Sequence, residues 1–203
     1  MTVHPTAHVE PGVVIGPNTA VWDNVHIRHS TRIGADCIIG EKSYIAYGVE
    51  IGDLVKINAF VYVCTAVTIE RGVMIAAGVV FTNDRCPRAT NPQLDRLLSS
   101  DPDEKTLKTL VCEGATIGAQ ATIGPGLRIG RFAMIGMGSV VTRDVPDFGI
   151  VAGNPAKLVG FACTCGRTLA GETTPDGRRE LKCRTCLAEY ALEGTKVTEA
   201  APV

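Results

Sequence analysis

Residues 25–52 read VHIRHSTRIGADCIIGEKSYIAYGVEIG, and every sixth residue in them, from Ile27 to Ile51, is an isoleucine. Followed outward, the same step meets only apolar residues from Val3 to Phe81, and it resumes from Val111 to Val141. A six-residue period fits neither an amphipathic helix nor a free-standing alternating strand. It indicates short strands joined by tight turns, with one β-branched side chain of each repeat pointing at a common axis.

Three such repeats close a coil of about eighteen residues, so the sequence predicts an all-β, hexapeptide-repeat parallel β-helix with coils about 4.8 Å apart. Glycine follows many of the axial residues, and we expect these glycines to relieve the corners. They are Gly16, Gly34, Gly40, Gly52, Gly118, Gly124, Gly130 and Gly136.

Residues eighteen positions apart should stack in outward columns on one face. One column contains His26, Tyr44, Tyr62 and Val80, and a second contains His29, Tyr47, Thr65 and Asn83. The face between Ile27 and Phe81 is therefore predicted to carry a polar and aromatic ladder, which suits either a subunit contact or a ligand.

Composition excludes several classes of partner. The 203 residues carry a formal net charge of −1 with a pI near 6.4. This balance argues against nucleic acid and membrane surfaces as partners. The N-terminus has neither the basic nor the apolar region of a signal peptide, and no apolar run is long enough to cross a membrane. We therefore predict a soluble, cytoplasmic protein.

Four of the eight cysteines have metal-ligand spacing. Cys163, Cys165, Cys183 and Cys186 form two close pairs joined by a polar stretch. Four thiolates suit a closed, structural zinc site, and free thiols are the alternative. We expect a zinc-ribbon-like appendage at 161–190 and a tail at 191–203. Cys37 is expected in the core, and Cys86 is expected to be exposed.

The repeat is interrupted at 82–110, a loop that a solenoid does not need for its stability. Its first half holds Asn83, Asp84, Arg85 and Arg88, which can bind sugar hydroxyls and phosphate or carboxylate oxygens. Its second half contains DPDEKTLKTL, where Asp101 is predicted to cap a short helix.

The repeat, the interruption and VTRDVPDFGIVAGNPAKLVG (141–160) together resemble the left-handed β-helix (hexapeptide) acyltransferases, over residues 1–160. VWDNVHIRHSTRIG (21–34) with FTNDRCPRA (81–89) is similar to the branch that acetylates nucleotide-linked 3-amino sugars. The resemblance implies a left-handed helix, a parallel homotrimer, and acyl-CoA bound in the cleft between neighbouring subunits.

The resemblance also implies a donor site in AGNPAK (152–157). Lys157, with Asn154 and Pro155, would reach a phosphate of coenzyme A. Gly136 and Gly138 would let the pantetheine arm approach the backbone closely.

For the acceptor, Asn83 is predicted to orient the attacking amine, and Asp84 is the alternative, as a base or a hydroxyl clamp. Arg85 and Arg88 are expected to bind substrate. His26, Arg28 and His29 are possible nucleotide contacts.

These features predict an acetyl-CoA-dependent N-acyltransferase acting on the 3-amino group of a UDP- or dTDP-linked amino sugar. Other acceptors, an amine or a hydroxyl, remain alternatives, but hydroxyl acylation needs a strong base and no histidine follows His29. A carbonic anhydrase built on the same solenoid would bind zinc through three histidines on adjacent subunits, and that site cannot be assembled because no histidine follows His29. A non-enzymatic scaffold is the remaining alternative, although it would not need the long interruption.

Overall fold

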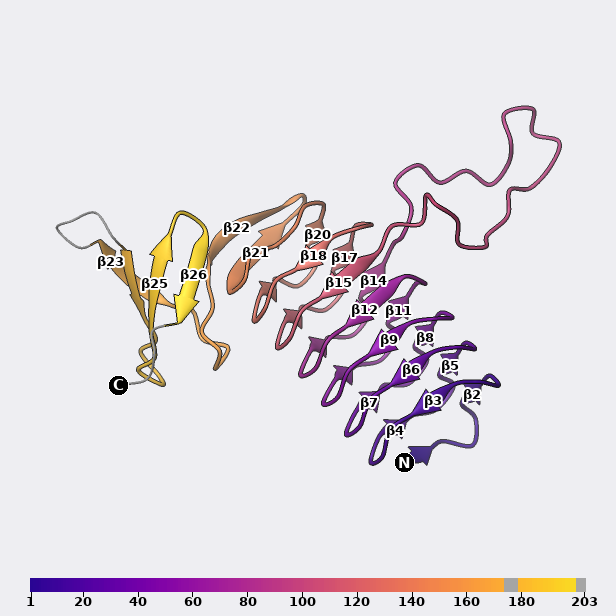
Figure 1. Ribbon diagram of the computed structural model, residues 1–203, viewed down its shortest axis with the longest axis horizontal. Coiled ribbons are helices and arrows are strands. Elements are labelled where there is room, and N and C mark those ends of the chain that lie inside the picture. Colours follow the sequence, from indigo (N-terminus) through magenta and orange to yellow (C-terminus); the bar gives the residue numbers. More distant parts are fainter. Residues whose placement is uncertain (174–178, 200–203) are drawn as a thin grey trace.

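A computed structural model describes residues 1–173 and 179–199 as a three-sided parallel solenoid with a small sheet at its C-terminal end (Figure 1). Throughout these two ranges the secondary structure is strand and turn, and neither range holds a helix able to cross a membrane. The predicted all-β parallel solenoid is confirmed.

Consecutive strands go in turn to three different sheets, as a coil of three repeats requires. The first sheet contains β1 (Thr2–Val3), β4 (Ala20–Val21), β7 (Ile38–Ile39), β10 (Lys56–Ile57), β13 (Met74–Ile75), β16 (Thr116–Ile117), β19 (Met134–Ile135), β21 (Gly149–Gly153) and β22 (Ala156–Phe161). The second contains β2 (His8–Val9), β5 (His26–Ile27), β8 (Tyr44–Ile45), β11 (Tyr62–Val63), β14 (Val80–Phe81), β17 (Thr122–Ile123) and β20 (Val140–Val141). The third contains β3 (Val14–Ile15), β6 (Arg32–Ile33), β9 (Glu50–Ile51), β12 (Val67–Ile69), β15 (Thr109–Val111) and β18 (Arg128–Ile129).

The axial residues form the core of the solenoid. Ile27, Ile45, Ile75 and Ile117 are fully buried, while the residue before each of them faces outward. Strand pairing keeps the eighteen-residue register, for example His26 with Tyr44 and Ile27 with Ile45. The periodicity therefore predicted both the core and the stacking.

The glycines after the axial residues have a different role from the one expected. The left-handed conformation that bends the chain falls two residues later, as at Asn24 (φ 53°) and Gly78 (φ 72°). Gly34 instead lies where an added Cβ would come within 2.6 Å of the Gly52 backbone in the next coil. These glycines permit close contact between coils.

The last coil continues into the antiparallel hairpin β21–β22 and then into a separate four-stranded sheet. This sheet, the ribbon, contains β23 (Ala170–Thr173), β24 (Arg179–Lys182), β25 (Glu189–Glu193) and β26 (Lys196–Glu199). It extends beyond residue 190, the predicted boundary of the appendage, and so includes much of the predicted tail. A second hydrophobic core, distinct from the solenoid core, joins Phe148 of the last coil to Tyr190 and Leu192 of the ribbon.

Candidate functional site

The interruption leaves the solenoid at the corner between the second and third sheets. β14 ends at Phe81 and β15 begins at Thr109, so the inserted loop is 82–108, close to the predicted 82–110. The Leu107 N–H donates to the Asn83 carbonyl at 2.9 Å, which holds the two ends of the loop together. Asn83 is half-buried at this neck, and the loop projects away from the solenoid beyond it (Figure 1).

The loop is organised by its own polar side chains. Asp84 Oδ1 accepts a 2.7 Å hydrogen bond from the Cys86 N–H, while Arg85 and Arg88 are exposed. Further along, Asn91 Oδ1 accepts from two backbone N–H groups of the same turn. The short helix predicted after Asp101 is wrong. Asp103 Oδ1 accepts from the Lys105 N–H and closes an isolated turn instead.

The predicted ladder lies on the second sheet and its neighbouring corner. The rings of Tyr44 and Tyr62 stack with centroids 5.4 Å apart, and those of His29 and Tyr47 stack at the same distance. The Tyr47 hydroxyl donates to the Ser100 carbonyl in the loop at 3.4 Å. The ladder therefore contacts the loop at Tyr47.

Glu10, which the sequence reasoning missed, contacts all three of the residues predicted to bind the nucleotide. Its carboxylate lies 3.0 Å from His26 Nε2, pairs with Arg28, and accepts the His29 N–H at 2.9 Å. The His29 N–H bond is the first of the causes that hold the Glu10 pKa below its ordinary value. The register could have revealed Glu10, because it stands eighteen residues before Arg28.

His8, Glu10 and His26 also bring ligand atoms within 4.8 Å of one another. Arg28 places its positive charge against the same carboxylate oxygen that His26 contacts. That charge opposes the binding of a cation, so this cluster is an ion-pair network among the described residues.

The residues predicted to bind the acyl donor meet at another corner, between the first and second sheets. AGNPAK forms the tip of the hairpin β21–β22, with a cis bond between Asn154 and Pro155 and an exposed Lys157. The Gly153 N–H donates to Ser139 Oγ at 3.2 Å. An added Cβ at Gly136 would lie 3.0 Å from the Ala152 Cβ, so the tip packs closely against this corner.

Gly138 lies at the same corner, with a left-handed φ of 67° and open space beside it. Asn83 follows β14 and Gly138 precedes β20. The two residues thus lie at opposite edges of the second sheet, meaning the two corners at which its short strands begin and end. A single chain does not bring the predicted acceptor and donor residues together.

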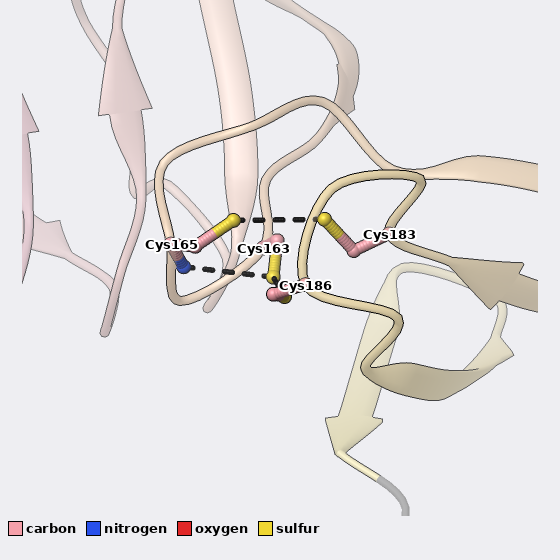
Figure 2. A group of neighbouring side chains, drawn as sticks. All are labelled: Cys163, Cys165, Cys183 and Cys186. Atoms are coloured by element: carbon pink, nitrogen blue, oxygen red, sulfur yellow. Dashed lines mark hydrogen bonds between the residues drawn. The ribbon is translucent and has the colours of Figure 1, made fainter.

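Four sulfurs gather where the hairpin meets the ribbon (Figure 2). Cys163 Sγ lies 3.3 Å from Cys186 Sγ, Cys165 Sγ lies 3.5 Å from Cys183 Sγ, and all four are within 4.8 Å of one another. A tetrahedral zinc with Zn–S bonds of about 2.3 Å places its sulfurs about 3.8 Å apart. The donor set and its spacing therefore fit zinc.

Backbone N–H groups favour the thiolate form of one of the four cysteines. Backbone N–H groups of Cys186 and Thr185 lower the pKa of Cys183 to about 6. A thiolate at this position is consequently favoured near neutral pH, and a thiolate is the form that binds a metal. The four sulfurs come from two loops that face each other, one holding Cys163 and Cys165 and the other Cys183 and Cys186.

The repeat, its sheets and these corners define a hexapeptide-repeat solenoid, and comparison with known proteins agrees. Residues 12–47 and 48–83 match the family described as bacterial transferase hexapeptide (six repeats). Residues 112–143 match the hexapeptide repeat of succinyl-transferase. Together the matches cover just over half of the chain, which belongs to the hexapeptide-repeat acyltransferase family.

Individual relatives include an amino-sugar N-acetyltransferase and a serine acetyltransferase. A dTDP-3-amino-3,6-dideoxy-alpha-D-galactopyranose 3-N-acetyltransferase from Aneurinibacillus thermoaerophilus is 52% identical over 58 residues, 29% of this chain and 30% of that protein. Serine acetyltransferase 4 of Arabidopsis thaliana is 28% identical over 159 residues, 78% of this chain and 29% of that protein. The chain thus spans about a third of the length of these curated relatives.

Among solved structures, the acetyltransferase domain of PglB from Neisseria gonorrhoeae FA1090, in complex with acetyl coenzyme A, is 20% identical. The match covers 77% of this chain and 56% of that chain, with a TM-score of 0.48.

Proposed function

We propose that the protein is an acetyl-CoA-dependent N-acyltransferase acting on the 3-amino group of a UDP- or dTDP-linked amino sugar. The observation that carries the proposal is the polar loop neck at Asn83, adjoining the aromatic ladder in an otherwise continuous solenoid. The 52% identity to a dTDP-3-amino-sugar N-acetyltransferase supports the acceptor class. A cytoplasmic setting suits eight cysteines that form no disulfide.

In the reaction, the sugar amine attacks the thioester carbonyl, a C–N bond forms and the C–S bond breaks. The amine is less basic than lysine because its neighbouring carbons bear hydroxyl groups, so a useful fraction is neutral near pH 7. The Asn83 side-chain oxygen accepts a hydrogen bond from the amine and aims its lone pair at the carbonyl. The leaving coenzyme A thiolate takes the proton released by the amine.

Asp84 serves better as a hydroxyl clamp than as a base in this scheme. Its Oδ1 already accepts the Cys86 N–H, and its other oxygen is available for a sugar hydroxyl. Arg85 and Arg88 supply positive charge to the diphosphate or to a sugar carboxylate. Arg28, His26 and His29, gathered by Glu10, would contact the nucleotide further along the ladder.

The donor would lie along the opposite edge of the second sheet, with Lys157 at a phosphate and Gly136 and Gly138 beside the pantetheine arm. Since acceptor and donor residues occupy opposite edges of one chain, a complete site needs the donor edge of a second copy. This requirement supports a parallel homotrimer, in which each cleft takes one edge from each of two neighbours.

The sulfur cluster would hold one structural zinc per chain. Four cysteine ligands complete a tetrahedron and leave no position for substrate, so such a zinc stabilises the ribbon and takes no part in acyl transfer. The ribbon core is small, which is the usual reason for a structural metal.

A turnover panel tests the proposal. Release of coenzyme A from acetyl-CoA would be followed with dTDP- and UDP-linked 3-amino sugars, with the matching 3-hydroxy sugar nucleotides, and with L-serine. We expect turnover with an amino sugar and none with its hydroxyl counterpart. Transfer to serine alone would favour a hydroxyl acceptor, and a protein that binds no coenzyme A would be a scaffold.

A further inference from the structure

The hairpin β21–β22 is joined to the solenoid through its inner strand, because β21 pairs with β19 and Val151 is buried in the solenoid core. Its outer strand β22 faces solvent over most of its length, and Leu158 and Val159 are 39% and 65% exposed. At the tip, Gly153 and Ala152 touch the Ser139 and Gly136 corner. The outer strand, which carries Lys157, touches the solenoid less, so its position depends on its pairing with β21 and on how its base is anchored.

That base is joined directly to the sulfur cluster. The N–H of Ala162, the residue after β22, donates to the Phe148 carbonyl at 2.7 Å, and Cys163 follows at once. The Leu169 N–H donates back to the Phe161 carbonyl at 2.8 Å. The segment that leaves the hairpin is thus tied both to the last coil and to the first cysteine knuckle.

Tyr190 connects the sulfurs to the solenoid. It is 2% exposed, and its hydroxyl lies 3.2 Å from Cys163 Sγ and accepts the Thr164 N–H at 3.2 Å. Its ring packs edge-on against Phe148 at 5.5 Å, and Phe148 stacks on Phe132 at 5.6 Å. The Tyr190 hydroxyl also lies 3.4 Å from Glu199 Oε1, to which it can donate. A metal-bound Cys163 thiolate can only accept, so the hydroxyl would then donate to this nearer sulfur.

We propose that Tyr190 is a positioning residue for the acyl donor: with the metal bound, it fixes the base of hairpin β21–β22 and so holds the AGNPAK tip where coenzyme A binds. The inference rests on the proposed function and assigns the ribbon a role in it. Loss of the metal frees Cys163 and the Tyr190 hydroxyl, and the hairpin base loosens. The acceptor neck at Asn83 lies at the opposite edge of the second sheet and is unaffected.

The test uses the full chain and two readouts that do not require turnover. Hydrogen exchange of residues 149–161 reports the hairpin, and calorimetry gives the Kd for coenzyme A. Removing the metal with a chelator under reducing conditions should raise both hairpin exchange and the Kd about tenfold, the usual scale of coupling between sites. Circular dichroism should show that the solenoid, which has its own core, stays folded.

Variants separate positioning from general loosening of the ribbon. Tyr190→Ala should reproduce the effect of metal removal, and the two should not add, because they break the same connection. Tyr190→Phe keeps the ring on Phe148 and should have a smaller effect. The matched control is Val197→Ala, which shortens a buried side chain of β26 that pairs in register with Leu192 and not with Tyr190. The control should leave the Kd for coenzyme A unchanged.

Unchanged hairpin exchange after metal removal, while ribbon amides exchange freely, would overturn the inference. An equal effect of Val197→Ala and Tyr190→Ala on the Kd would also overturn it, since Tyr190 would then act only through ribbon stability. A wild-type protein that binds no coenzyme A would instead refute the proposed function. Hairpin exchange would still decide whether the metal and the hairpin are coupled.

Discussion

At the scale of single residues, Asn83 and Asp84 are neighbours with different environments. Asn83 is half-buried, and its backbone is fixed by the Leu107 N–H, so its side chain starts from a defined position. Asp84 is exposed and uses one oxygen to close a turn. A positioning contact benefits from such fixation, because small displacements of the reacting groups are costly.

Asn83→Ala is therefore expected to lower kcat by about 10²-fold, the scale of a lost positioning contact. Asp84→Asn is the matched control, because its amide oxygen can still accept the Cys86 N–H while the charge is removed. It should retain most of the turnover. Steady-state kinetics with saturating sugar nucleotide measures both.

His26→Ala and His29→Ala should act mainly on the KM of the nucleotide sugar. The mechanism is refuted if either histidine variant, or Asp84→Asn, abolishes turnover while Asn83→Ala stays active.

Cysteine reactivity offers a test that does not depend on the function. Burial raises the pKa of Cys64 to about 11, and it also raises the pKa of Cys37 and Cys112. At pH 8 these thiols stay protonated and buried, whereas Cys86 is exposed in the loop.

Iodoacetamide should consequently label Cys86 first in the metal-loaded protein, as mass spectrometry of peptides would show. The Cys86→Ser variant should take up label only after denaturation or metal removal. Rapid labelling of Cys64 in the native protein would contradict the buried core.

Much of the stacking of individual side chains could be predicted by counting residues along the eighteen-residue register. The columns of His26, Tyr44 and Tyr62 follow from the eighteen-residue register alone, because parallel pairing leaves each side chain one neighbour above and one below. Glu10 follows from the same register but was overlooked. Its bonds to His26 and His29 depend on how far side chains reach across coils, which periodicity does not encode.

At the scale of elements, local patterns mislead where tertiary pairing decides. The stretch after Asp101 has helix-starting residues. A helix of so few residues, however, forms too few hydrogen bonds to offset the unfavourable free energy of nucleation. Its last residues are needed elsewhere, since Thr109 and Leu110 pair with Val67 and Thr68 of β12. The chain therefore stays extended and re-enters the third sheet.

The hairpin makes a prediction for donor binding. Lys157 is the exposed last residue of the AGNPAK tip, far along the chain from Asn83. Lys157→Ala should raise the KM for acetyl-CoA more than it lowers kcat, because it removes a charge contact remote from the reacting carbonyl. Lys56→Ala, an exposed lysine on β10 of the same sheet, is the control and should change neither constant. An unchanged KM in Lys157→Ala would remove this residue from the donor site.

At the scale of the whole molecule, the two hydrophobic cores predict two unfolding units. The solenoid core consists of stacked aliphatic residues, while the ribbon core is small and surrounds two of the cysteines. Purified protein should contain one zinc per chain. Chelation should unfold the ribbon alone and leave the cooperative thermal transition of the solenoid, as calorimetry would show.

Metal analysis well below one equivalent, with four freely titrating thiols at these positions, would disprove the zinc site. The Cys183→Ser variant should behave like the chelated protein, because three ligands close the tetrahedron less tightly.

The exposed apolar side chains bear on the assembly. Leu94 and Leu97 of the loop are 79% and 78% exposed, and Trp22 and Phe60 at the corner between the first and second sheets are 51% and 58% exposed. A soluble monomer seldom leaves large apolar surface uncovered, whereas a subunit contact would cover it. The loop lies at one edge of the second sheet and the aromatic corner at the other, so a parallel trimer could bring them together at each interface.

Light scattering at micromolar concentration should therefore give three times the 21.4 kDa of one chain. Replacing Leu94 and Leu97 by serine should weaken this assembly and abolish turnover together, since the complete site needs two chains. The control is Leu187→Ser in the ribbon, which is 67% exposed and should change neither mass nor turnover. A monomeric protein with full activity would contradict both the trimer and the shared site, because one chain holds Asn83 and Gly138 at opposite edges of its second sheet.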